Sequence, residues 1–233
     1  MGVIAHTLPR NLILVKLYHL WKCSNNLFWQ LADGSGGFER LTTSAYQNFP
    51  MSWSGDGQLL AVGEVRPNTG RDISVLQLRD RKVQPFLQTP FTEGGAAFSP
   101  DGHWLAYSSD ESGRTEIYVQ PYPGPGGKWQ VSTDGGAEPV WNRNGRELFY
   151  RSGDKMMSVD VSTQPTFSIG KPRLLFTGQY APTAATISNY DVSPDGQRFL
   201  MIKSNEQAQA IAQINVILNF TEELKRRVPT GTK

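Results

Sequence analysis

The chain has 233 residues, a nearly balanced net charge of +2 and a hydrophobic fraction of 38%. This length allows one large domain or two small ones, and the hydrophobic content is sufficient for a packed core. The weak charge bias does not suggest the basic stripe typical of nucleic-acid-binding proteins, and we expect no nucleic-acid partner. Glycine (23 residues), proline (15 residues) and aromatic residues (11%) are plentiful, a mixture that favours short strands joined by tight turns.

The first 26 residues differ from the rest of the chain. The stretch after Arg10, NLILVKLYHLW, is partly apolar but is interrupted by Lys16. A secretory signal needs an unbroken apolar region, so we interpret this stretch as a strand or a non-native start, with a signal or anchor as the alternative. No run of about 20 apolar residues occurs, and we therefore expect no transmembrane helix.

A turn sequence that occurs four times is the main feature of the chain. The apolar residues before the four copies, which begin with Trp53, are separated by 45, 43 and 51 residues. A period in this range indicates a repeat architecture. The turn residues are Ser54, Asp56 and Gly57, then Ser99, Pro100, Asp101 and Gly102, then Asn142, Asn144 and Gly145, and finally Ser193, Pro194, Asp195 and Gly196.

Each turn position has a structural reason. Serine or asparagine accepts a local backbone hydrogen bond, proline presets φ, aspartate or asparagine suits the third position, and glycine takes a positive φ. The turns could be mistaken for acid–base or calcium sites. We expect separate blades to hold equivalent turns apart in space, and Asn144 cannot act as a base. The sequence therefore predicts a structural role for these residues.

Apolar strands follow each turn in phase. After the second turn come WLAYS (Trp104), EIYVQPY (Glu116) and WQVST (Trp129). LFWQLA (Leu27) and ERLTTS (Glu39) are interpreted as the last strands of an earlier unit. The pattern predicts an all-β fold, a β-propeller of four-stranded antiparallel blades with three complete units from about residues 51, 97 and 139. The alternative is a β-sandwich with coincidental turns.

The end of the chain departs from the repeat. Thr221 is a candidate helix N-cap, Lys225 to Arg227 suit a helix C-terminus, and Pro229 ends the segment. We expect a short C-terminal helix there. The predicted organisation is a divergent N-terminal segment (1–26), a β-propeller (27–220), and a short helix and tail (221–233).

The stretch FSPDGHWLAYSSDESGRTEIYVQPY, together with ERLTTS and the ending INVILNFTEELKRRVP, resembles the TolB-type, WD40-like propeller repeat. It is also similar to the C-terminal propeller of bacterial serine/threonine kinases. That family usually has six blades, whereas about five units are visible here. Either the two termini together complete one blade and close the ring, or the ring stays open and its exposed strand edge favours oligomerisation. The resemblance implies protein–protein contacts and a periplasmic or extracytoplasmic location, with a cytoplasmic location as the alternative.

Catalytic motifs are absent from the sequence. It has no G-x-S-x-G elbow and no kinase H-R-D or D-F-G motif, so we expect no enzymatic activity from this chain. His19 and Cys23 are spaced to share a helix face, but a structural zinc site needs four ligands. We therefore predict no metal and no cofactor.

The loop PYPGPGGKW from Pro121 is the most unusual connection, and Tyr122 and Trp129 flank it. It is a candidate partner-binding loop, with a plain inter-strand connection as the alternative. The leading hypothesis for function is a non-catalytic scaffold or sensor that binds a protein or peptide partner. The alternatives are the propeller part of a receptor-type serine/threonine kinase or prolyl-oligopeptidase-like peptidase, and a binder of small ligands or carbohydrates in the central channel.

Overall fold

The computed structural model describes residues 12–16, 26–164, 166–181 and 188–203. All regular elements in these ranges are strands, which confirms the all-β prediction for the described residues. The chain divides into two compact units, Met1–Ile202 and Lys203–Lys233, and the strands of the described residues all belong to the first. The predicted helix from Thr221, the expected strand at 214–220, and His19 and Cys23 lie outside the described residues.

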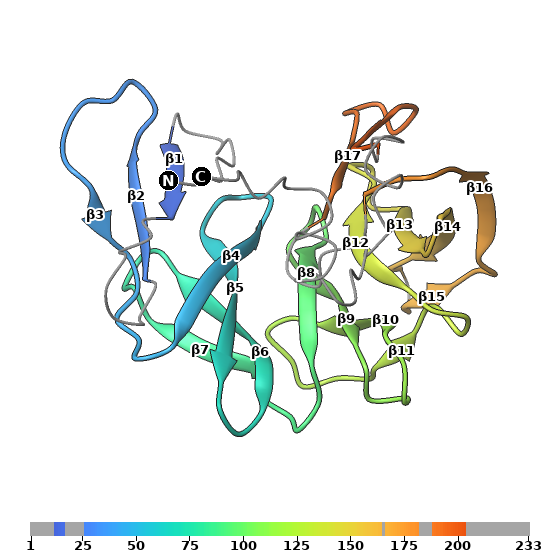
Figure 1. The fold of residues 1–233 in the computed structure, drawn as a ribbon, viewed down its shortest axis with the longest axis horizontal. Coiled ribbons are helices and arrows are strands. Elements are labelled where there is room, and N and C mark those ends of the chain that lie inside the picture. Colours follow the sequence, from blue (N-terminus) through green and yellow to red (C-terminus); the bar gives the residue numbers. More distant parts are fainter. Residues whose placement is uncertain (1–11, 17–25, 165, 182–187, 204–233) are drawn as a thin grey trace, which may run out of the picture. The chain divides into compact units, whose positions relative to one another are not determined.

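Three consecutive antiparallel sheets, here called blades 1, 2 and 3, form the middle of the chain (Figure 1). Each strand pairs with the next along the chain, and in blade 3 the place of the fourth strand is shared by two short strands that both pair with the third. The three units predicted from the repeat are thereby confirmed, each beginning slightly earlier than expected. Blade 1 contains β4 (Gln47–Trp53), β5 (Leu59–Arg66), β6 (Gly70–Gln77) and β7 (Val83–Leu87); blade 2 contains β8 (Glu93–Phe98), β9 (Trp104–Ser109), β10 (Glu116–Pro121) and β11 (Trp129–Gln130); blade 3 contains β12 (Ala137–Trp141), β13 (Glu147–Ser152), β14 (Lys155–Ser162), β15 (Ser168–Ile169) and β16 (Arg173–Thr177).

A smaller sheet lies on either side of the blades in the chain. The N-terminal sheet contains β1 (Leu12–Lys16), β2 (Leu27–Leu31) and β3 (Glu39–Arg40), and β2 pairs with both of the others. The C-terminal hairpin contains β17 (Tyr190–Val192) and β18 (Phe199–Met201). The interpretation of the N-terminal apolar stretch as a strand is thus confirmed for residues 12–16.

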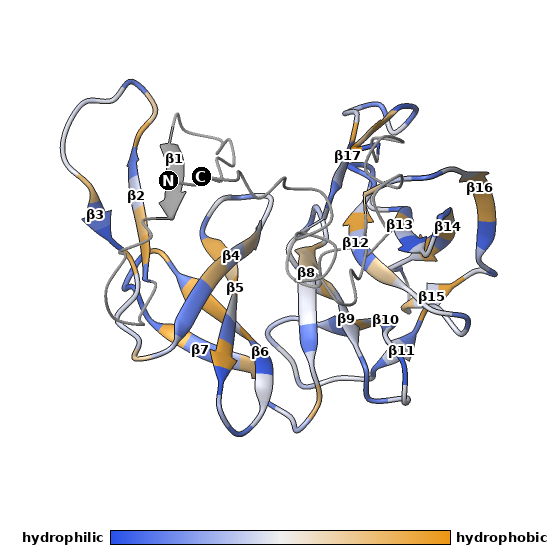
Figure 2. Ribbon diagram, viewed as in Figure 1, coloured by the Kyte–Doolittle hydropathy of each residue, from blue (hydrophilic) through white to orange (hydrophobic). Residues whose placement is uncertain are grey.

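Four clusters of buried apolar side chains lie between consecutive sheets. Figure 2 colours the ribbon by hydropathy and shows hydrophobic residues along the strands of the blades. Side chains alternate along a strand, so Leu105 and Tyr107 of β9 face blade 1 whereas Ala106 faces blade 3. Because both faces of blade 2 are covered, its central strand β9 is buried along almost its whole length. Representative pairs are Leu27 and Leu60 between the N-terminal sheet and blade 1, Ile73 and Tyr118 between blades 1 and 2, Ile117 and Val159 between blades 2 and 3, and Met156 and Phe199 between blade 3 and the C-terminal hairpin.

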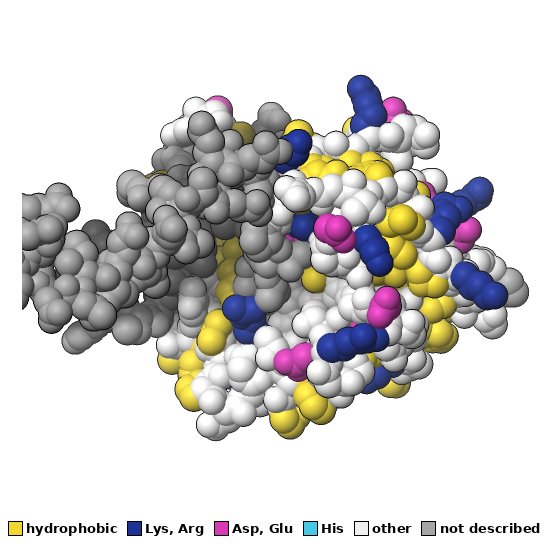
Figure 3. Space-filling view, turned by 45° about the vertical axis from the view of Figure 1, so that its right-hand side comes forward, with side chains coloured by type: hydrophobic (Ala, Val, Ile, Leu, Met, Phe, Trp, Pro, Cys, Tyr) yellow, Lys and Arg dark blue, Asp and Glu magenta, His cyan; other side chains and the backbone are white. Residues whose placement is uncertain are grey.

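The C-terminal hairpin has one covered and one open apolar face among the described residues. Phe199 and Met201 pack on blade 3, whereas Leu200 is 75% exposed and Ile202 is 56% exposed. Figure 3 turns the side that carries blade 3 toward the reader and shows apolar side chains between charged ones. The strand expected to continue this sheet, 214–220, is outside the described part of the chain.

The repeated turns have nearly the same geometry. In blade 2, the amide of His103 donates to Asp101 Oδ1 (3.1 Å), the amide of Trp104 donates to Ser99 Oγ (3.0 Å), and the Ser99 hydroxyl donates to the Asp101 carboxylate. The fourth residue has a left-handed conformation in every copy, with φ between 69° for Gly57 and 74° for Gly102. Each turn therefore satisfies its own polar groups, as its sequence indicates.

Equivalent turns of neighbouring blades lie against one another, so the expectation that blades hold them apart is wrong. A Cβ atom added at Gly55 would lie 2.2 Å from the carbonyl oxygen of Pro100, and one added at Gly196 would lie 2.4 Å from Asn142 Nδ2. The physical reason is that the first strands of consecutive blades are direct neighbours: the amide of Phe98 donates to Ser52 Oγ (2.8 Å). The aspartates nevertheless remain bound within their own turns.

This contact predicts a large effect of a small substitution. Gly55→Ala is expected to lower the free energy of unfolding by about 2 kcal/mol, because the new methyl group overlaps backbone that cannot rotate away. Gly37→Ala is the matched control, since nothing lies within 4 Å of its added Cβ. Urea unfolding of both variants measures the difference, and equal stabilities would contradict the turn-to-turn contact.

Candidate binding face

Each blade has two ends with different chemistry. The turn end carries the turn between the first and second strands and the connection between the third and fourth. The loop end carries the segment leading into the first strand and the loop between the second and third. At the turn end, a backbone hydrogen bond joins the end of the third strand, or the residue after it, to the turn in each blade. These bonds run from the Leu78 amide to Gln58 O (3.0 Å), from the Tyr122 amide to His103 O (2.8 Å) and from the Val161 amide to Arg146 O (2.8 Å). The backbone groups at the turn end are therefore used in contacts within the blade, and the loop end is the candidate surface for binding a partner.

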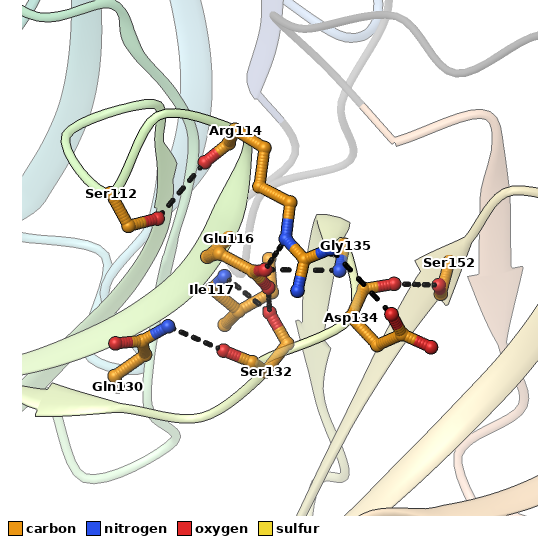
Figure 4. Close-up of polar contacts among 9 residues, drawn as sticks. All are labelled: Ser112, Arg114, Glu116, Ile117, Gln130, Ser132, Asp134, Gly135 and Ser152. Atoms are coloured by element: carbon orange, nitrogen blue, oxygen red, sulfur yellow. Dashed lines mark hydrogen bonds and ion pairs between the residues drawn. The ribbon is translucent and has the colours of Figure 1, made fainter.

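Glu116 organises the loop end of blade 2 (Figure 4). This carboxylate is 1% exposed and accepts from Arg114 Nε (2.6 Å), the amide of Gly135 (3.0 Å) and the hydroxyl of Ser132. Ser132 Oγ in turn accepts from the amide of Ile117 (2.8 Å). Because Gly135 lies in the segment that enters blade 3, Glu116 joins two strands of one blade to the start of the next.

The same arrangement recurs in the N-terminal sheet. The amide of Leu27 donates to Thr42 Oγ1 (2.8 Å), the Thr42 hydroxyl donates to Asn26 Oδ1 (3.1 Å), and the amide of Ser44 donates to that same oxygen (2.8 Å). Asn26 therefore occupies the place of Glu116. A network that is repeated from sheet to sheet is structural, so recognition must depend on features that the repeat does not supply.

One such feature is a group of carboxylates where blades 1 and 2 meet. Glu93, the first residue of β8, is 1% exposed, and its Oε2 atom has no hydrogen-bond partner in the described part of the chain. The same is true of Asp72 Oδ1. Burial raises the pKa of Glu93 to about 7, and the negative charges of Asp72, Asp110 and Glu111 add to the rise. Asp72 is paired with Arg66 (3.4 Å from Nε to Oδ2), whereas Glu93 and Asp110 have no ion pair among the described residues.

A solvent-open cavity of about 430 Å³ lies at the loop end of blade 2, and Glu111, whose charge acts on Glu93, forms part of its lining. Lys128 Nζ lies 2.5 Å and 2.6 Å from the two carboxylate oxygens of Glu111, and 5.3 Å from the centre of the Tyr118 ring. The side chains that line the cavity are Phe91, Glu111, Ser112, Tyr118, Lys128 and Gln130. It thus combines an aromatic wall with an ion pair and an amide.

Exposed aromatic rings occupy equivalent places on two blades. Phe91 is 40% exposed and lies two residues before Glu93, and Tyr46 is 38% exposed and lies two residues before Asn48. The Arg66 guanidinium lies over the Tyr46 ring, 5.4 Å from its centre. Sequence reasoning missed Phe91 because it lies in an irregular connection between repeats, where the only signal is a large apolar residue beside a proline.

The predicted loop residues Tyr122 and Trp129 pack inward and in different directions. Tyr122 lies 5.3 Å from Phe98, ring centre to ring centre, in the cluster between blades 1 and 2. Trp129 lies 4.6 Å from Phe167, in the cluster between blades 2 and 3. Both side chains are half-buried, so the structure does not bring them together as one exposed surface.

The other predicted site residues, those of the four turns, all lie at the turn end and none lines the cavity. Among the described residues, no group of three or more histidine, cysteine, aspartate and glutamate side chains is placed to bind a metal ion. In the same part of the chain, no helix has the length and apolar character needed to cross a membrane.

The fold is that of a TolB-type β-propeller. TolB from Acinetobacter baumannii superposes with a TM-score of 0.64 at 20% sequence identity, over 81% of this chain and 45% of that one. A protein assigned as TolB in Agrobacterium tumefaciens gives a TM-score of 0.64 at 15% identity, over 82% of this chain and 69% of that one. At these identities the likeness concerns the fold alone.

No protein-family model matches the sequence. An uncharacterized protein of Agrobacterium fabrum is 25% identical over 199 residues, which cover 74% of this chain and 60% of that protein. The chain thus spans less than two thirds of the length of this curated relative. The similarity to kinase-linked propellers stays a prediction from the sequence.

Proposed function

We propose that this chain is a non-catalytic propeller module that binds a protein or peptide partner through the loop end of blades 1 and 2. The observation that carries the proposal is the ring of Phe91, 40% exposed, on the wall of a cavity of about 430 Å³. Tyr46 repeats this exposed ring on the neighbouring blade, next to Arg66. Aromatic and arginine side chains dominate the binding energy of protein interfaces, so this surface has suitable chemistry.

The lining of the cavity supports binding rather than catalysis. Ser112 is its one aliphatic hydroxyl group, and that hydroxyl donates to the carbonyl of Arg114 (3.2 Å) instead of to a base. Lys128 and Glu111 are paired with each other. A hydrolytic site needs a nucleophile bonded to a base, and the described lining residues do not form one. An extracytoplasmic location, suggested by the likeness in fold to TolB, is part of the proposal.

Panning a library of displayed random peptides on the purified chain tests this function. We expect enrichment of peptides whose affinity falls about tenfold or more in the Phe91→Ala variant, a loss typical of an aromatic anchor. Phe38→Ala is the matched control, because Phe38 is also exposed (51%) but lies next to the N-terminal sheet. Peptides that bind wild type and the Phe91→Ala variant equally would place the interface elsewhere.

A further inference from the structure

We propose that the cavity beside Phe91 receives a cationic side chain, lysine or arginine, of the bound partner. This inference rests on the proposed function and names the chemistry that its site selects. Three observations on the described residues carry it: an ammonium group of the chain itself already binds there, the surrounding carboxylates exceed the available cations, and an exposed aromatic ring forms one wall.

Lys128 shows what the cavity binds. Its ammonium group contacts both oxygens of Glu111 (2.5 Å and 2.6 Å) and lies 5.3 Å from the centre of the Tyr118 ring. A carboxylate and an aromatic face are the two groups that attract an ammonium or guanidinium ion most strongly. The Lys128 side chain is 40% exposed, so a cation from a partner can compete for this position or share Glu111 with it.

The balance of charge around the cavity favours another cation. At the loop end of blade 2, Arg114 pairs with Glu116 and Lys128 pairs with Glu111. Glu93 and Asp110 have no ion pair among the described residues. Glu93 Oε2 is buried with no hydrogen-bond partner in the described part of the chain, whereas the neighbouring Asp72 is paired with Arg66 through its Oδ2 atom (3.4 Å). A partner's positive charge would offset this excess, whereas a negative charge would increase it.

Phe91 adds selectivity for a cation with an apolar stem. Lysine and arginine side chains lay their methylene groups along apolar surface while the charged head stays polar. The exposed ring of Phe91 offers that surface, and Gln130, whose amide NH2 donates to the carbonyl of Ser132 (2.9 Å), belongs to the same lining. A small inorganic cation would gain nothing from the ring, so the arrangement fits a side chain better than an ion.

Fluorescence anisotropy with labelled, end-blocked nonapeptides tests the inference. The probe is three repeats of Arg-Ala-Ala, compared with versions in which lysine, norleucine or glutamate replaces arginine. We expect the arginine and lysine versions to bind, and the norleucine and glutamate versions to bind at least about tenfold more weakly. Equal binding of the norleucine version would overturn the proposal, as would no binding of the arginine version.

Two pairs of variants separate the site from general electrostatic attraction. Glu111→Gln should weaken binding of the arginine probe about tenfold, whereas Asp154→Asn, an exposed carboxylate at the loop end of blade 3, should leave it nearly unchanged. Lys128→Met should strengthen binding several-fold because it vacates the cation position, while Lys155→Met should have little effect. Equal effects within either pair would contradict a site at the cavity.

The two proposals fail differently. If library peptides still lose affinity in Phe91→Ala but show no preference for lysine or arginine, the cavity binds a partner through other chemistry and only the present inference is wrong. If no peptide depends on Phe91, the proposed function itself fails.

Discussion

Replacing Arg151 with methionine is expected to lower the free energy of unfolding by about 4 kcal/mol. Arg151 is 3% exposed; its Nη1 atom donates to the carbonyl of Ala181 (2.8 Å) and its Nη2 atom donates to the carbonyl of Gly153 (3.1 Å). Nη1 also lies 3.6 Å from Glu138 Oε2, and the Glu138 side chain is fully buried. Removing one member of a buried ion pair leaves the other charge desolvated, which typically costs about 3–5 kcal/mol.

Arg146→Met is the matched control, because this arginine begins the same hairpin but is exposed and should tolerate the change within about 0.5 kcal/mol. The double variant Glu138→Gln/Arg151→Met should recover part of the loss, since it removes both charges. Denaturant unfolding of wild type, the single variants Arg151→Met and Glu138→Gln, and the double variant measures the coupling between the two residues. A loss below about 1 kcal/mol for Arg151→Met would mean that the pair is hydrated in solution.

The repeat made most of the fold predictable because each turn is a local structure. Ser99 and Asp101 satisfy their polar groups within five residues of the chain, so the sequence of the turn contains all the information it needs. The contact between Gly55 and Pro100, in contrast, joins two blades and is not local in the sequence. It depends on how one blade is placed against the next, and no short stretch of sequence encodes that placement.

The buried charges could not be predicted for a related reason. In a sequence, Glu138 and Arg151 resemble the surface residues of any strand, and only the pairing of β12 with β13 brings them into one buried place. Glu138 also has a φ of 58°, and it lies at an irregularity in the first strand of blade 3. In the first strand of blade 2, the residue at the corresponding irregularity is Gly95, with a φ of 59°. The left-handed backbone conformation costs a glutamate about 1–2 kcal/mol, so the local conformational preference of this residue disfavours the structure that it adopts.

The candidate site was hidden from the sequence because its parts lie outside the repeat. Phe91 is in the connection that leads into blade 2, and Lys128 ends the loop between β10 and β11. Neither residue belongs to a motif. The notable composition of the proline- and glycine-rich loop pointed to Tyr122 and Trp129 instead, and both of these rings pack between blades.

Glu93→Gln is expected to stabilise the protein by about 3 kcal/mol at pH 8 and to leave its stability nearly unchanged at pH 4. Burial, with the negative charges of Asp72, Asp110 and Glu111, raises the pKa of Glu93 from its ordinary value of 4.5 to about 7. The folded protein therefore holds a proton that the unfolded chain releases between these two values. Wild type loses this contribution as pH rises from about 4.5 to about 7, and each pH unit is worth about 1.4 kcal/mol.

The difference in unfolding free energy between wild type and Glu93→Gln, measured from pH 4 to pH 8, isolates this group from all other titrations. Glu39→Gln should show the opposite dependence of stability on pH. Hydrogen bonds from Trp29 and Arg81 lower the pKa of Glu39, so the stability that its charge contributes is present above pH 4.5 and is lost as pH falls. A difference for Glu93→Gln that does not change with pH would show that water or a bound cation already compensates its charge. Because a cation beside ionised Glu93 lowers its pKa, addition of the arginine nonapeptide should shift the midpoint of this difference to lower pH.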